Sequence, residues 1–145
     1  MRPPRSVIGL WAMLIVISAL LLLSAARSIL GYFESAQYDG VATRMSLVEY
    51  LLERPQDTLL PPFVGLMAAI AAAGVFGGRR WARPLAAAVG VATILGGAFL
   101  LLVVLSELGL PGSFAILFLP PALLALLVGA FVVYAALRNA AYLSR

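Results

Sequence analysis

The sequence predicts an all-α integral membrane protein, built as an antiparallel bundle of four transmembrane helices with a short extracytoplasmic amphipathic helix between helices 1 and 2. Hydrophobic residues make up 63% of the 145 residues and charged residues 11%, with a mean hydropathy of +1.07. Soluble domains carry about 25% charged residues. The apolar runs lack the two-residue alternation of barrel strands, and lipid tolerates only helices or closed barrels.

The few charges leave four long stretches free of any charged residue. These stretches hold 21 to 30 residues, and a spanning helix needs about 20. The length fits a single domain, 1–145. The predicted spans cover approximately residues 7–30, 60–78, 84–106 and 113–138.

The first span is the most uniformly bulky, which suits a helix that faces lipid. An alternative interpretation makes it a signal peptide that is cleaved after the small residues Ser24, Ala25 and Ala26. The apolar run before them exceeds the usual length of about 7–15 residues for such a segment. We therefore expect a retained transmembrane helix.

Residues 32–58 form the only sizeable predicted segment outside the membrane. Within residues 41–53, the apolar residues recur at helical spacing, and Pro55 ends the pattern. This predicts an amphipathic helix that rests on the bundle or in the headgroup layer. A second interpretation makes its apolar face a docking surface for a partner. That face comprises Val41, Met45, Val48 and Leu52.

The second and third spans are rich in alanine and glycine. Small residues four apart allow the backbone of a neighbouring helix to approach closely. The connecting turn is short, so we expect these two spans to form the tightly packed hairpin at the bundle centre. The candidate packing residues are Ala69, Ala73, Gly74 and Gly78 in the second span and Ala88, Ala92 and Gly96 in the third.

The fourth span contains the pair Pro120-Pro121, which leaves two arrangements open. Either one helix starts at Ser113 and kinks at the prolines, which we expect, or the helix starts at the prolines. Leu60-Pro61-Pro62 repeats this pattern at the start of the second span. A duplicated helical hairpin would produce the repeat, although prolines before a span are also common.

Arginine placement predicts the orientation of the bundle. Four spans place the N-terminus, the loop 78–84 and the C-terminus on one side, with seven arginines and no acid. The other side has three arginines and six acids. The positive-inside rule then predicts that both termini are cytoplasmic, in a multi-pass protein of a prokaryotic plasma (inner) membrane.

Arginine also dominates the turn between spans two and three. Arg79, Arg80, Trp81 and Arg83 in this turn, with Arg138 after span four, suit anionic lipid headgroups and a topology anchor. The alternative is a docking site for a partner. Arginines spread over three juxtamembrane sites do not predict nucleic-acid binding.

Residue types that carry chemistry are missing from the sequence. It contains no Cys, His or Lys, so the usual metal, haem and nucleophile sites cannot form, and we expect no cofactor and no catalytic residue. Thr93, inside the third span, is expected to bond its own helix backbone. Arg27 and Glu107, at the outer ends of spans one and three, are candidates for an interfacial ion pair, unless each separately reaches the headgroups.

The sequence offers packing surfaces but no candidate catalytic or cofactor-binding residues. This predicts a non-enzymatic accessory or structural subunit, or an assembly partner, of a larger membrane complex. Its partners would be the lipid bilayer, with anionic headgroups on the cytoplasmic side, and a membrane protein or further copies of itself. The alternative is a homo-oligomeric channel, transporter or lipid-handling protein whose pathway forms between protomers.

Overall fold

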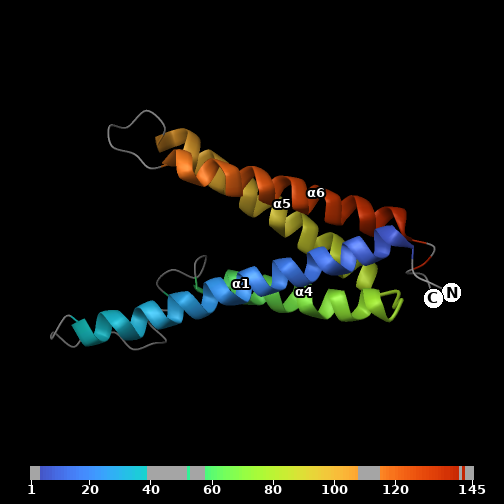
Figure 1. Ribbon diagram of the computed structural model, residues 1–145, viewed down its shortest axis with the longest axis horizontal. Helices are drawn as coiled ribbons and strands as arrows, with labels where there is room; N and C mark the ends of the chain where they lie inside the picture. Colours follow the sequence, from blue (N-terminus) through green and yellow to red (C-terminus); the bar gives the residue numbers. More distant parts are fainter. Residues whose placement is uncertain (1–3, 39–51, 53–57, 108–114, 141, 143–145) are drawn as a thin grey trace.

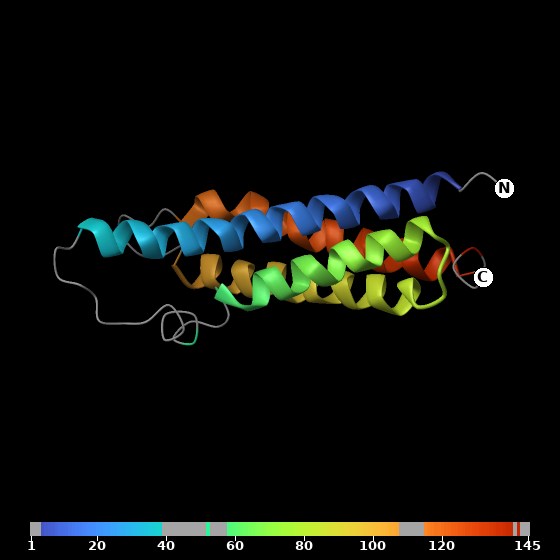
Figure 2. The same cartoon turned by 90° about the horizontal axis from the view of Figure 1, so that it is seen from below.

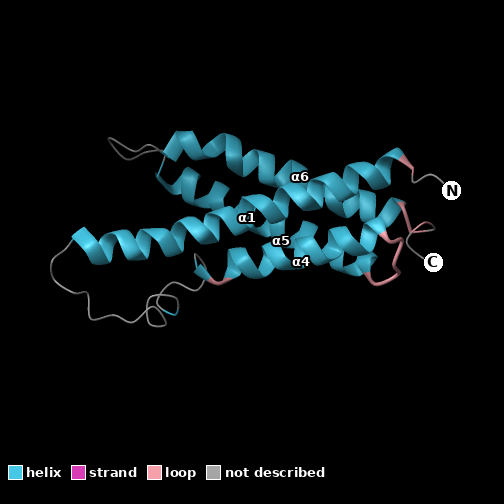
Figure 3. Cartoon of the chain, turned by 60° about the horizontal axis from the view of Figure 1, so that its bottom comes forward, coloured by secondary structure: helices cyan, strands magenta, loops and turns pink. Residues whose placement is uncertain are grey.

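The protein is an all-α helical bundle. A computed structural model describes residues 4–38, 52, 58–107, 115–140 and 142, and this part contains helices and turns but no strand (Figure 3). Within these residues, four α-helices and one 3₁₀ turn follow one another (Figure 1). They are α1 (Arg5–Tyr38), α4 (Leu60–Phe76), α5 (Ala82–Glu107), the 3₁₀ turn η1 (Ala115–Phe118) and α6 (Leu119–Arg138).

The described helices make this a membrane-embedded protein. Three segments are long and apolar enough to cross a bilayer: Arg5–Phe33, Ala82–Glu107 and Ile116–Arg138. Helix α4 is equally apolar but has only 17 residues, at the lower end of the length a span requires. Its role as a fourth span therefore stays a prediction.

Two Leu-Pro-Pro sequences start helices. Helix α4 begins at Leu60 and α6 at Leu119, each with proline in its first two positions. Proline costs little there because the first N–H groups of a helix have no partner within it. Of the two arrangements predicted for the fourth span, the α-helix begins at the proline pair, and η1 precedes it directly. Ser113, where we expected the helix to start, lies outside the described residues, and the four described residues before α6 form the 3₁₀ turn and not an α-helix.

Helix α1 extends beyond its predicted end. Its 34 residues reach Tyr38, eight residues past the predicted end at residue 30 and into the segment expected outside the membrane. The predicted amphipathic helix 41–53 lies outside the described residues. The exception is Leu52, which is exposed.

The helices pair as two hairpins, α1 with α4 and α5 with α6. The α5–α6 contact is the most extensive and is built on glycine: a Cβ at Gly129 would lie 2.7 Å from the carbonyl oxygen of Gly90. We expected the tight hairpin between the second and third spans, and this was wrong. Helices α4 and α5 are joined by a short turn, but the turn keeps them adjacent only at one end.

The turn after α4 is a Schellman motif. Gly78 adopts φ +63°, its N–H donates to the carbonyl oxygen of Val75 (3.1 Å), and the N–H of Arg79 donates to that of Gly74 (2.9 Å). Glycine takes this left-handed conformation without a Cβ penalty. The Gly77-Gly78 pair therefore ends α4 and directs the chain into α5.

The two hairpins meet at one end of the molecule and diverge toward the other (Figure 1). Helix α1 lies beside α6, and α4 beside α5, and both of these interfaces are less extensive than those within each hairpin (Figure 2). The first turn of α1, the last turn of α6 and the turn before α5 lie at the end where the hairpins meet, here called the basic end. The other end, with the last turns of α5 and the start of α6, is the open end.

Candidate functional site

The basic end is held together by a buried asparagine. Asn139, at the end of α6, accepts a hydrogen bond from Ser6 Oγ (2.8 Å) and donates one from Nδ2 to the carbonyl oxygen of Ala135 (2.7 Å). Only 7% of its surface is exposed. Ser6 lies in the first turn of α1. This contact therefore ties one hairpin to the other.

Arginines and aromatic residues surround the hydrogen bond between Ser6 and Asn139. Arg79, Arg80 and Trp81 are exposed, and Arg83 is half-buried. Arg138 donates a hydrogen bond to Tyr134 Oη (2.8 Å) and lies over the Tyr134 ring, as an interfacial aromatic–arginine pair would. The structure thus brings the predicted arginine anchors to one end of the bundle.

The hydrophobic core fills only the half of the bundle near the basic end. It combines the first turns of α1 and α5 with the last turns of α4 and α6. On α1 it runs from Val7 to Ile17, and on α5 it stops at Val89. Nothing equivalent joins the two hairpins in the other half of the described chain.

One face of α5 shows where the core ends. Ala82, Val89 and Gly96 are spaced by seven residues, about two helical turns, and therefore point in nearly the same direction. Ala82 and Val89 are buried, with Val89 only 2% exposed. Gly96 is exposed, and a Cβ added there would meet nothing within 4 Å.

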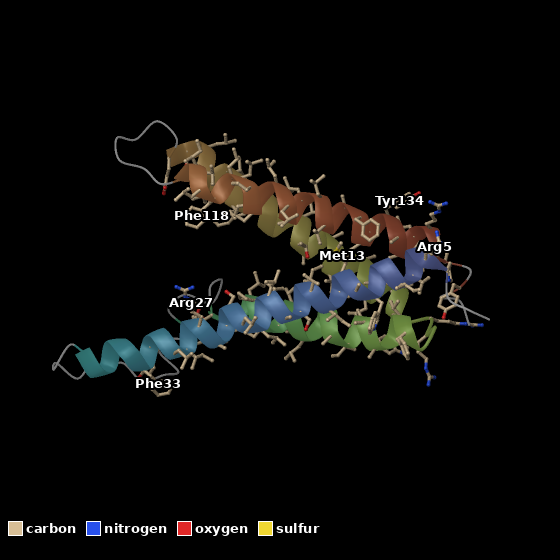
Figure 4. All side chains as sticks on the ribbon, viewed as in Figure 1. Arg5, Met13, Arg27, Phe33, Phe118 and Tyr134 are labelled. Atoms are coloured by element: carbon tan, nitrogen blue, oxygen red, sulfur yellow. The ribbon has the colours of Figure 1, made fainter. Side chains whose placement is uncertain are left out.

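One face of α1 likewise changes from contact with the other hairpin near the basic end to exposure near the open end. A Cβ at Gly9 would lie 3.4 Å from Phe131 of α6, so this face meets the other hairpin near the basic end. Arg27 follows Gly9 by 18 residues, or five turns, and points the same way. It is exposed, and Figure 4 shows it directed toward the space between the hairpins, with Phe118 directed into that space from the other side.

The predicted ion pair between Arg27 and Glu107 is not formed. Both residues are exposed, and neither bonds to any residue that the structure describes. They lie on different hairpins at the open end, where the hairpins are apart (Figure 1). The prediction required the ends of α1 and α5 to adjoin, and the divergence prevents this.

Most of the predicted small packing residues face away from the rest of the chain. Gly74 is buried against Trp81 and Ala82 at the α4–α5 junction, as expected. Ala92 and Gly78 are half-buried, and Gly78 forms part of the turn after α4. The prediction of intramolecular packing was wrong for the exposed residues Ala69, Ala73, Ala88 and Gly96.

The sequence analysis missed the glycines that do pack. Gly90, Gly97 and Gly129 are buried between α5 and α6, and a Cβ at Gly97 would lie 3.0 Å from the carbonyl oxygen of Ala122. Gly90 and Gly97 are seven residues apart and so share one face of the helix. That spacing was the available signal, whereas the prediction relied on small residues four apart.

Among the described residues, no group of three or more acidic side chains could hold a metal ion. The hydroxyl of Thr93 donates to the carbonyl oxygen of Val89 (2.8 Å), which confirms the expected bond to its own helix. The described side chains therefore offer packing surfaces and a single cation, Arg27, that faces the space between the hairpins at the open end. No family model, curated protein or solved structure matches the chain.

Proposed function

We propose that the protein is a non-enzymatic accessory subunit that associates within the bilayer with a larger membrane protein. In this proposal it crosses a prokaryotic plasma membrane four times, and the basic end is cytoplasmic. The seven arginines on that side support the orientation. Arg79, Arg80 and Trp81 of the α4–α5 turn, with Arg83 in the first turn of α5, would anchor it among anionic headgroups.

The observation that carries the proposal is the open glycine at residue 96. Glycine inside a helix costs about 0.5–1 kcal/mol relative to alanine, because it loses more backbone freedom on folding. Gly90, Gly97 and Gly129 offset that cost by allowing α5 and α6 to approach closely. Gly96 has no such neighbour among the described residues, and, unlike the equally open Gly31, it continues a stripe of small residues along its helix, so a helix from another chain is the contact that would explain it.

The surface around Gly96 fits a helix–helix interface. Ala88, Ala92 and Gly96 follow one another at four-residue spacing along α5, and none of them is buried. Small residues at this spacing allow close packing between transmembrane helices, where van der Waals contact replaces the hydrophobic effect as the driving force. We assign this stripe to the partner, together with the exposed Ala69 and Ala73 of α4.

The test compares two glycines that both face open space. The full chain, carrying a C-terminal tag, is purified in mild detergent from its native membrane, and the co-purifying subunits are identified and quantified. Gly96→Leu is expected to abolish recovery of the partner. Gly31→Leu, on α1, where a Cβ also meets nothing within 4 Å, should leave recovery unchanged. Equal recovery with both variants would contradict the assignment.

The second candidate is a homo-oligomer that transports ions or handles lipid. The same stripe favours it, because a stripe on one copy can pack against the stripe on another. Native mass measurement separates the two functions. A uniform oligomer of this chain alone would refute the accessory subunit, whereas a fixed ratio to a larger subunit would refute the homo-oligomer.

A further inference from the structure

The space between α1 and α6 at the open end is apolar on both walls. Leu20 follows Gly9 by 11 residues, about three turns, and so faces the same side of α1. It is 62% exposed. Leu124 lies two turns before Phe131 on α6 and is 61% exposed. These residues and Phe118, which is 54% exposed, lie on the apolar faces that the two hairpins turn toward each other at the open end, and we call these faces together the outer groove.

Arg27 lies at the mouth of the outer groove. It follows Arg5 by 22 residues, a rise of about 33 Å in a helix, and the hydrocarbon layer of a bilayer is about 30 Å thick. With Arg5 at one membrane surface, the guanidinium therefore lies at the headgroup level of the other. It points toward the groove, with no ion pair or hydrogen bond from the described residues (Figure 4).

We propose that the outer groove binds one phospholipid of the leaflet at the open end, with its phosphate on Arg27 and an acyl chain between Leu20 and Leu124. Guanidinium and phosphate form paired, charge-assisted hydrogen bonds. The acyl chain would cover the apolar walls. This site lies between α1 and α6, apart from the α5 stripe assigned to a partner protein, so the two proposals stand independently.

The charge of Arg27 favours a lipid over a protein helix as the occupant. A helix packed between the hairpins would bury the guanidinium, and a buried charge is costly unless an acidic group opposes it. A phospholipid supplies the anion at the level where Arg27 lies and the apolar chain at the level of Leu20. A single phospholipid therefore complements both the charge of Arg27 and the apolar walls of the outer groove.

The test uses a fluorescent reporter inside the outer groove. Leu124→Trp is made in a background with Trp11→Phe and Trp81→Phe, so that the new indole is the only tryptophan. The purified chain in neutral detergent is titrated with phosphatidylglycerol that carries bromine on an acyl chain. We expect saturable quenching, and Arg27→Gln should raise the midpoint about tenfold or more, as for the loss of a charged hydrogen bond.

Two matched variants show whether the effect belongs to this arginine. Arg27→Lys keeps the charge and should retain most of the binding. Arg5→Gln removes an exposed arginine at the basic end and should leave the midpoint unchanged. The proposal is overturned if Arg27→Gln titrates like the parent chain, or if no lipid quenches the indole, which would indicate that a protein segment fills the groove.

If the tryptophan background does not fold, native mass spectrometry of the otherwise unaltered chain replaces the reporter. The chain is titrated with phosphatidylglycerol, and bound lipids are counted at each concentration. Arg27→Gln should remove one saturable lipid that Arg5→Gln retains. Identical lipid counts in the parent chain and Arg27→Gln would also overturn the proposal.

Discussion

The glycine contact between α5 and α6 gives a quantitative prediction for Gly129→Ala. The added Cβ would lie 2.7 Å from the carbonyl oxygen of Gly90 and 2.9 Å from the backbone nitrogen of Ile94. Both are backbone atoms, so no side chain can rotate away and α5 must shift. Overpacking of this kind typically costs about 1–3 kcal/mol. We expect Gly129→Ala to lower the free energy of unfolding by that amount.

Gly96→Ala is the matched control, since it makes the same chemical change in a helix where the new Cβ meets nothing within 4 Å. It should leave stability unchanged or raise it by up to about 1 kcal/mol, because alanine favours the helix. Both variants are unfolded with SDS from mixed micelles, and tryptophan fluorescence follows the transition, since Trp11 packs against Phe76 with ring centroids 5.9 Å apart. Equal stabilities for Gly129→Ala and Gly96→Ala would refute the assigned packing.

Three further predictions concern the basic end. Asn139→Ala removes the hydrogen bonds to Ser6 and Ala135 and should cost about 1–3 kcal/mol in the same unfolding assay, whereas an unchanged stability would exclude the tie between hairpins. Gly78→Ala forces alanine into a left-handed conformation and should cost about 1–2 kcal/mol; no loss would contradict the Schellman turn. Replacing Arg79, Arg80 and Arg83 with glutamate should make a C-terminal reporter fusion appear partly outside the cell, and an unaltered reporter would show that these arginines do not set the orientation.

The sequence predicted where the helices lie better than it predicted which helices pack against each other. Charge-free stretches and the two Leu-Pro-Pro sequences marked where the apolar helices lie, because lipid forces the backbone to bond within each segment. They could not mark the end of α1, which continues to Tyr38 although polar residues begin near Glu34. A helix leaving the membrane loses no backbone bond by continuing.

The prediction of which helices pair was wrong because small residues occur on several faces of α4 and α5. A short turn fixes adjacency at one end of two helices, but it does not fix their crossing angle. The observed pairing depends on glycines that meet across α5 and α6, such as Gly90 with Gly129. The seven-residue spacing of Gly90 and Gly97 marks a packing face of α5, but it does not show which helix packs against that face. For the same reason, the divergence that separates Arg27 from Glu107 was not predictable from either residue.

The separation of the two hairpins at the open end is the central claim, and a pair of spin-label distances tests it most directly. The chain contains no cysteine, so two introduced cysteines are the only labelling sites. Leu23 with Leu117 reports on the open end, and Ile8 with Leu137 on the basic end; all four side chains are exposed. Measured in lipid nanodiscs, the open-end distance should be clearly longer. Equal distances at the two ends would mean a closed, parallel-sided bundle and would contradict the account.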